Sequence, residues 1–109
     1  MTNKLFQFGL RVRDGSGPAA KRVIVVCFAS APDADTAVKD ASGKLVLERR
    51  LVIEALEGTV REVPVDRFGD FIQATTPGMQ HDYPSPEALP ALVEAGTLFF
   101  GPQYPVADA

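Results

Sequence analysis

Apolar and polar side chains alternate along the first part of the chain. Phe6, Phe8, Leu10 and Val12 share one parity, and the residues between them are polar, charged or glycine. A period of two places successive side chains on opposite faces of an extended backbone, so this pattern predicts a half-buried strand. Residues 22–28 are almost all apolar and rich in β-branched side chains, which predicts a central strand covered on both faces.

Two stretches that place Asp and Ser beside Gly, residues 14–18 and 40–44, punctuate this part of the chain. Glycine reaches positive φ without strain, and Asp and Ser favour turns through local hydrogen bonds. The first stretch predicts a hairpin between the two strands. The second predicts a turn followed by a strand with Leu45 and Leu47 on one face.

The segment 36–48 can also be read as a helix. Ala37, Ala41 and Leu45 have the spacing of one helical face. Two residues are placed to cap such a helix: Asp33 and Asp35. Against it, Gly43 would lie mid-helix, where glycine costs about 1 kcal/mol relative to alanine. We therefore expect the turn and keep the helix as the alternative, which would imply a ferredoxin-like α+β domain.

The second half of the chain contains shorter elements. The apolar run 51–56 and the extended-favouring run 59–65 flank a Glu-Gly pair, which predicts another hairpin. Residues 70–75 are expected to form a strand that ends at a Pro-Gly turn. A Ser-Pro-Glu start and a terminal glycine predict a short helix over 86–95. A last strand is expected at 97–100.

Length and composition indicate one globular domain without a nucleic-acid or membrane partner. The 109 residues are 46% hydrophobic and 23% charged, as in ordinary globular proteins. Eleven Lys and Arg against 14 Asp and Glu give a net charge of -3, which offers no basic field to phosphates or anionic lipid. No apolar run approaches the roughly 20 residues of a membrane span. The N-terminal residues lack the apolar segment of a signal peptide, so we expect a cytoplasmic protein.

Candidate catalytic groups are few. Cys27 is the single cysteine and lies in an apolar strand, which favours a buried structural thiol over a nucleophile. His81 and Asp82 form the most reactive-looking pair. One histidine with scattered carboxylates lacks the ligand spacing of a zinc site, so a solvated loop is the favoured interpretation. We expect neither a metal nor a cofactor, and we favour a non-enzymatic protein.

The order of strands and turns in 8–48, together with 70–79, resembles that of transthyretin-like or carboxypeptidase-regulatory-like β-sandwich domains. The motifs that carry the likeness are the turn at 14–18, the apolar strand after it, the turn at 40–44 and the Pro-Gly-Met turn at 77–79. The resemblance implies a mainly β, antiparallel sandwich, here with one short C-terminal helix. That fold includes hydroxyisourate hydrolases, but their N-terminal histidine and C-terminal Tyr-Arg-Gly-Ser motif have no counterpart in this sequence.

Three aromatic residues near the end of the chain, Phe99, Phe100 and Tyr104, are grouped with two prolines. Aromatic side chains are enriched at protein contacts, so these residues are the candidate contact surface. We expect a binding or assembly module that contacts a protein partner or a second copy of itself. Two alternatives remain: a dimeric ferredoxin-like protein that binds a small molecule, with weak catalysis at His81, and an immunity or inhibitor protein.

Overall fold

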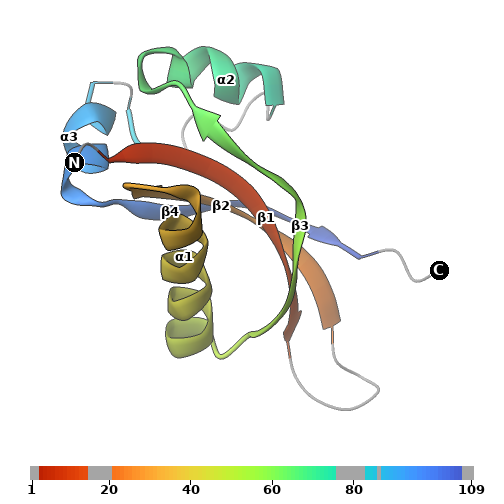
Figure 1. The fold of residues 1–109 in the computed structure, drawn as a ribbon. Coiled ribbons are helices and arrows are strands. Elements are labelled where there is room, and N and C mark those ends of the chain that lie inside the picture. The colour runs from red at the N-terminus through yellow and green to blue at the C-terminus, as the bar shows by residue number, and fades with distance from the viewer. Residues whose placement is uncertain (1–2, 15–20, 76–82, 86, 107–109) are drawn as a thin grey trace.

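The computed structural model describes residues 3–14, 21–75, 83–85 and 87–106, and these form one antiparallel sheet with helices on both faces (Figure 1). The strand order is β3-β1-β2-β4. Strands hold more of the described residues than helices, so the fold is mainly β. The elements in chain order are β1 (Lys4–Asp14), β2 (Lys21–Ala31), α1 (Ala34–Arg49), β3 (Val52–Val63), the 3-10 helix η1 (Val65–Arg67), α2 (Phe68–Thr75), α3 (Leu89–Ala95) and β4 (Leu98–Pro105).

The first two strands pair as the sequence predicts. β1 and β2 are antiparallel over their full lengths, from Lys4 opposite Ala31 to Asp14 opposite Lys21. Most of the predicted turn at 14–18 lies outside the described residues. Both strands are central in the sheet, with β3 beside β1 and β4 beside β2.

The turn expected at 40–44 is wrong, because 36–48 belongs to the helix α1. Asp33 is the N-cap, and its carboxylate accepts a hydrogen bond from the Thr36 N–H at 2.8 Å. Ala37, Ala41 and Leu45 are fully buried. Burial of one leucine side chain is worth about 1.5–3 kcal/mol, which together with the cap outweighs the cost of about 1 kcal/mol for a mid-helix glycine.

The transthyretin-like sandwich is not confirmed. The described strands belong to a single sheet, and helices rather than a second sheet pack on its faces. The segment 36–48, on which much of the resemblance depends, is helical. The ferredoxin-like alternative is right about this helix, but its β-α-β-β-α-β order differs from the observed start, in which β1 and β2 come before the first helix.

Two further expectations are wrong for local reasons. The predicted hairpin over 51–65 is one strand, β3, in which Gly58 adopts φ 71 where the pairing with β1 shifts register. A glycine in this conformation produces a bulge that leaves the strand running in the same direction. The predicted strand at 70–75 is part of α2, whose Phe68 and Ile72 are one helical turn apart and buried.

The end of the described chain follows the prediction in the type and order of its elements, but the last strand does not end at Gly101 as predicted and is longer. α3 forms within the predicted range and ends at Gly96, which adopts φ 85 in the left-handed region. β4 begins at the predicted strand and continues to Pro105. No helix among the described residues is long and apolar enough to cross a membrane.

Each face of the sheet has its own core, because the two parities of β1 and β2 point to opposite sides. One core lies under α1, and the other lies under η1, α2 and α3 and contains a group of stacked and edge-on aromatic rings. The buried members of the α1 core are Phe6, Phe8, Leu10, Val12, Val25, Cys27, Ala29, Ala31, Ala37, Ala41, Leu45 and Leu51. Those of the second core are Leu5, Phe28, Val63, Phe68, Ile72, Tyr83, Leu89 and Val93.

Candidate functional site

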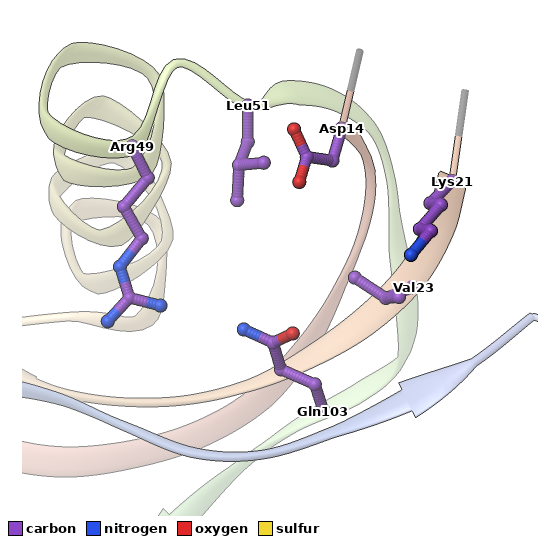
Figure 2. Close-up of a pocket in the computed structure, with 6 residues that line it drawn as sticks. All are labelled: Asp14, Lys21, Val23, Arg49, Leu51 and Gln103. Atoms are coloured by element: carbon purple, nitrogen blue, oxygen red, sulfur yellow. The ribbon is translucent and has the colours of Figure 1, made fainter. Parts of the chain in front are cut away.

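A pocket of about 350 Å³ opens between the C-terminal end of α1 and the nearby ends of the strands (Figure 2). We call it the α1-end pocket. It combines charged, amide and aliphatic side chains from β1, β2, β4, the end of α1 and the link between α1 and β3. Its lining residues are Asp14, Lys21, Val23, Arg49, Leu51 and Gln103.

Strand pairing explains why these side chains share one site. Asp14 and Lys21 are directly opposite each other in β1 and β2, on the face that α1 covers. Val23 is two residues further along β2 and therefore points to the same side. Gln103 of β4 is opposite Val25, a member of the α1 core, and so also faces α1. Figure 2 shows the Asp14, Lys21 and Gln103 side chains around the space beside the end of the helix.

Arg49 supplies a fixed positive charge to the pocket. Its guanidinium carbon lies over the Phe100 ring at 4.7 Å from the ring centroid, a favourable cation-π arrangement. Within the described part of the chain, none of Arg49, Lys21 and Asp14 has an ion-pair partner within 4.0 Å. The pocket therefore presents two cations and one anion that no described residue neutralises by direct pairing.

Cys27 lies in the α1 core near this arginine but has the properties of a structural thiol. Burial raises the pKa of Cys27 to about 12, and the positive charge of Arg49 opposes that shift only in part. Its Sγ lies 3.5 Å from the Val25 carbonyl oxygen, which accepts the thiol hydrogen bond. A thiol that stays protonated at neutral pH is a poor nucleophile, and its burial agrees with the sequence-based interpretation.

The other face of the sheet is only partly covered. The helical layer of η1, α2 and α3 packs on Leu5, Phe28, Val63 and Phe99, which lie toward one end of the sheet (Figure 1). On this face, the side chains toward the other end of the sheet belong to neither core. Their positions opposite one another in the strand pairing place them on the face away from α1. We call this region the open sheet surface: Arg11, Arg13, Arg22, Ile24, Val52, Ala55 and Tyr104.

Arginine, aliphatic and aromatic side chains are interleaved across the open sheet surface. Ile24 lies between Arg11 on β1 and Tyr104 on β4 in the cross-strand order. Tyr104 is 48% exposed and Val52 is 44% exposed, so apolar area here is in contact with solvent. Large exposed apolar side chains that gather on one face indicate a surface for a partner.

Two ion pairs organise the charges on this surface. Arg11 contacts Glu57 at 3.0 Å, and Arg22 contacts Glu54 at 3.3 Å. Arg13 lies directly opposite Arg22 in the pairing of β1 with β2 and has no carboxylate within 4.0 Å among the described residues. One positive charge of the group is thus left without a counter-charge from the part of the chain that the structure describes.

The structure does not gather the three predicted contact residues into one surface. Phe99 is stacked on Phe28 in the second core, with ring centroids 4.9 Å apart. Phe100 lies on the opposite face, against the α1 core and under Arg49. Tyr104 alone is on the open sheet surface. His81 and Asp82 lie outside the described residues.

Sequence reasoning missed Arg13 and Gln103 as candidate site residues. Arg49, with the neighbouring Arg50, is a candidate for binding a carboxylate or phosphate from sequence alone, although the exposed face of a strand is the favoured interpretation there. The parity of β1 gave a usable signal for Arg13, because Arg11 and Arg13 share the face opposite Phe8 and Leu10. No comparable signal pointed to Gln103, which joins Arg49 in the pocket only because β4 pairs with β2. Comparison with known proteins adds nothing: no family model, curated protein or solved structure matches the chain.

Proposed function

We propose that this chain is a non-enzymatic binding domain that docks a protein partner on the open sheet surface. The observation that carries the proposal is Arg13, which has no ion-pair partner among the described residues and lies beside the exposed Val52 on a sheet face that the described helices leave open. Tyrosine and arginine are the residue types that most often anchor protein interfaces. A rigid sheet holds them in place, which lowers the entropy lost on binding.

The partner that fits this surface carries carboxylates around an apolar residue. The surface holds three arginines. Two of them are paired with glutamates, which leaves a local excess of one positive charge. The chain as a whole has a charge of -3, so the remaining surface is acidic. An acidic partner would be attracted to the open sheet surface and repelled by the net negative charge of the rest of the molecule, which favours one orientation during encounter.

Two finer aspects of the function are part of the same proposal. We place the protein in the cytoplasm, where a single unpaired cysteine such as Cys27 is ordinary. An immunity or inhibitor role is a special case of the same docking, in which the partner is a toxin or an enzyme. Identification of the partner separates these cases.

Photo-crosslinking tests the location of the docking surface. A photoreactive phenylalanine analogue is placed at Tyr104, and in a matched control at Leu47, which is 83% exposed on α1. In cells that produce the protein naturally, we expect a distinct crosslinked partner from position 104 and none from position 47. Equal crosslinking from both positions would contradict the docking surface. A crosslink between two copies of the chain would assign the surface to a homodimer and rule out the acidic partner.

Calorimetry with the purified partner then tests the chemistry. Arg13→Glu reverses the unpaired charge and should weaken binding by about tenfold or more. Arg67→Glu changes an exposed arginine of η1, outside the open sheet surface, and should alter affinity by less than about twofold. Circular dichroism of each variant verifies the fold. An unchanged affinity for Arg13→Glu would overturn the assignment.

A further inference from the structure

We propose that the α1-end pocket binds a small zwitterion, specifically an α-amino acid with an aliphatic side chain. The pocket lies on the face of the sheet that α1 covers, opposite the open sheet surface. This inference is therefore independent of the protein-docking proposal. It depends on three properties of the pocket: its two cations, its single anion and its aliphatic wall.

The two cations suit a carboxylate. Arg49 offers the planar donor fork that binds a carboxylate through two hydrogen bonds, and Lys21 adds a second positive charge from β2. Phe100 lies against the guanidinium and holds it in place before a ligand arrives. No carboxylate of the described chain is paired with either cation, so a ligand carboxylate would displace only water.

The anion and the amide suit the other end of the ligand. Asp14 reaches the same pocket from β1, and Figure 2 shows its carboxylate turned toward Leu51 and the pocket interior. An ammonium group placed there would gain an ion pair and a charge-assisted hydrogen bond. Gln103 can both donate and accept a hydrogen bond beside it. With one carboxylate between two cations and one ammonium beside one anion, the ligand's charges complement those of the pocket.

Size and the apolar wall restrict the ligand further. Val23 and Leu51 form the aliphatic lining, and Leu51 is itself anchored in the α1 core. A volume of about 350 Å³ is at the small end of ligand pockets, which run from roughly 300 to 1,000 Å³. An amino acid of leucine's size fits this volume with its side chain against the aliphatic lining.

A nitrogen-15 NMR titration with three probes tests the inference. L-Leucine carries both charges, N-acetyl-L-leucine lacks the ammonium, and isoamylamine lacks the carboxylate. We expect L-leucine to shift the Gln103 side-chain amide and the backbone amides of Lys21 and Leu51 in a saturable manner. Each truncated probe should bind about tenfold more weakly, because it leaves one set of pocket charges without a partner.

Variants assign the two ends of the ligand. Asp14→Asn should weaken the binding of L-leucine and leave the binding of N-acetyl-L-leucine unchanged. A variant that had lost its fold would bind neither probe, so this pair of results identifies the loss of the ammonium contact. Arg49→Gln should weaken both, and Arg67→Gln in η1 on the other face serves as the matched control. The inference is overturned if L-leucine causes no saturable shift, if the acetylated probe binds equally well, or if Arg49→Gln binds like the unaltered protein.

Discussion

Burial affects the pKa of the Cys27 thiol more strongly than the neighbouring charge of Arg49 does. The arginine charge favours the thiolate, whereas removal of the thiol from water disfavours it, and burial is the larger effect because the pKa of Cys27 rises to about 12. Arg49 also contributes to the pocket by its position over Phe100. One side chain thus has a weak effect on the core thiol and a defined place in the α1-end pocket.

The protonated state of Cys27 gives a prediction about reactivity. At pH 8, 5,5′-dithiobis(2-nitrobenzoate) should label the native protein far more slowly than the protein unfolded in urea, because the thiol is buried and undissociated. Absorbance at the thionitrobenzoate band measures both rates. Labelling of the native protein at the unfolded rate would show that Cys27 is not in the core.

The same shift in pKa also sets the sign of a pH effect on stability. The folded-state pKa of Cys27, about 12, is above the unfolded value of about 8.5, so the unfolded state loses its proton first as the pH rises. The stabilising contribution is complete below the unfolded pKa and declines as the pH rises toward 12. Urea denaturation between pH 8 and pH 10 should therefore show a steeper loss of stability for the unaltered protein than for Cys27→Ala.

At the scale of elements, two glycines in different settings should respond in opposite ways to alanine. Gly43 lies in α1, and a methyl group added to its Cα would have no atom within 4 Å, so Gly43→Ala should stabilise the protein by about 0.5–1 kcal/mol through helix propensity. At Gly101, a methyl group would lie 2.7 Å from the Tyr83 hydroxyl oxygen and 3.4 Å from Phe28. Gly101→Ala should destabilise it by about 1–3 kcal/mol.

Urea denaturation of the two alanine variants beside the unaltered protein measures both changes. The result would contradict the structure if Gly43→Ala were the more destabilising of the two. Such an outcome would favour the turn at 40–44 over the helix, because a turn glycine at positive φ resists replacement whereas a helical glycine does not.

The errors of sequence interpretation also belong to the element scale. Period-two alternation predicted β1 correctly because one of its faces is apolar throughout. The interpretation of 40–44 as a turn failed at α1. The local cost of Gly43 was visible in the sequence, but the tertiary burial of Ala37, Ala41 and Leu45 was not. Sequence interpretation failed again at α2, because a short apolar run has no period long enough to distinguish a helix from a strand.

The candidate site was less accessible to prediction than the fold, because it forms only in the whole molecule. Asp14 and Lys21 could be brought together by the predicted hairpin. Gln103 is more than 80 residues from either in sequence and reaches the pocket only because β4 pairs with β2. Arg49 has no defined place if 36–48 is interpreted as a turn and strand. Strand order, which no local pattern encodes, decides which polar side chains meet.

Because β1 and β2 supply side chains to both cores, we expect the whole molecule to unfold as one unit. Leu45→Ala opens the α1 core and Ile72→Ala opens the second core, and each should cost about 2–5 kcal/mol, since both side chains are almost fully buried. Leu47→Ala is the control on exposed α1 surface and should stay within about 0.5 kcal/mol.

Far-UV circular dichroism reports on all the elements in such an experiment, and the tyrosine band of the near-UV spectrum reports on Tyr83, which is buried among the aromatic rings of the second core. If the sheet couples its two faces, the two signals change at the same urea concentration in every variant, although Leu45 lies on the opposite face from those rings. An early near-UV transition in Ile72→Ala, with the far-UV signal largely retained, would instead mean that η1, α2 and α3 unfold separately. The open sheet surface and the α1-end pocket would then be held by the four strands and α1 alone, and binding at either site should survive the loss of the helical layer.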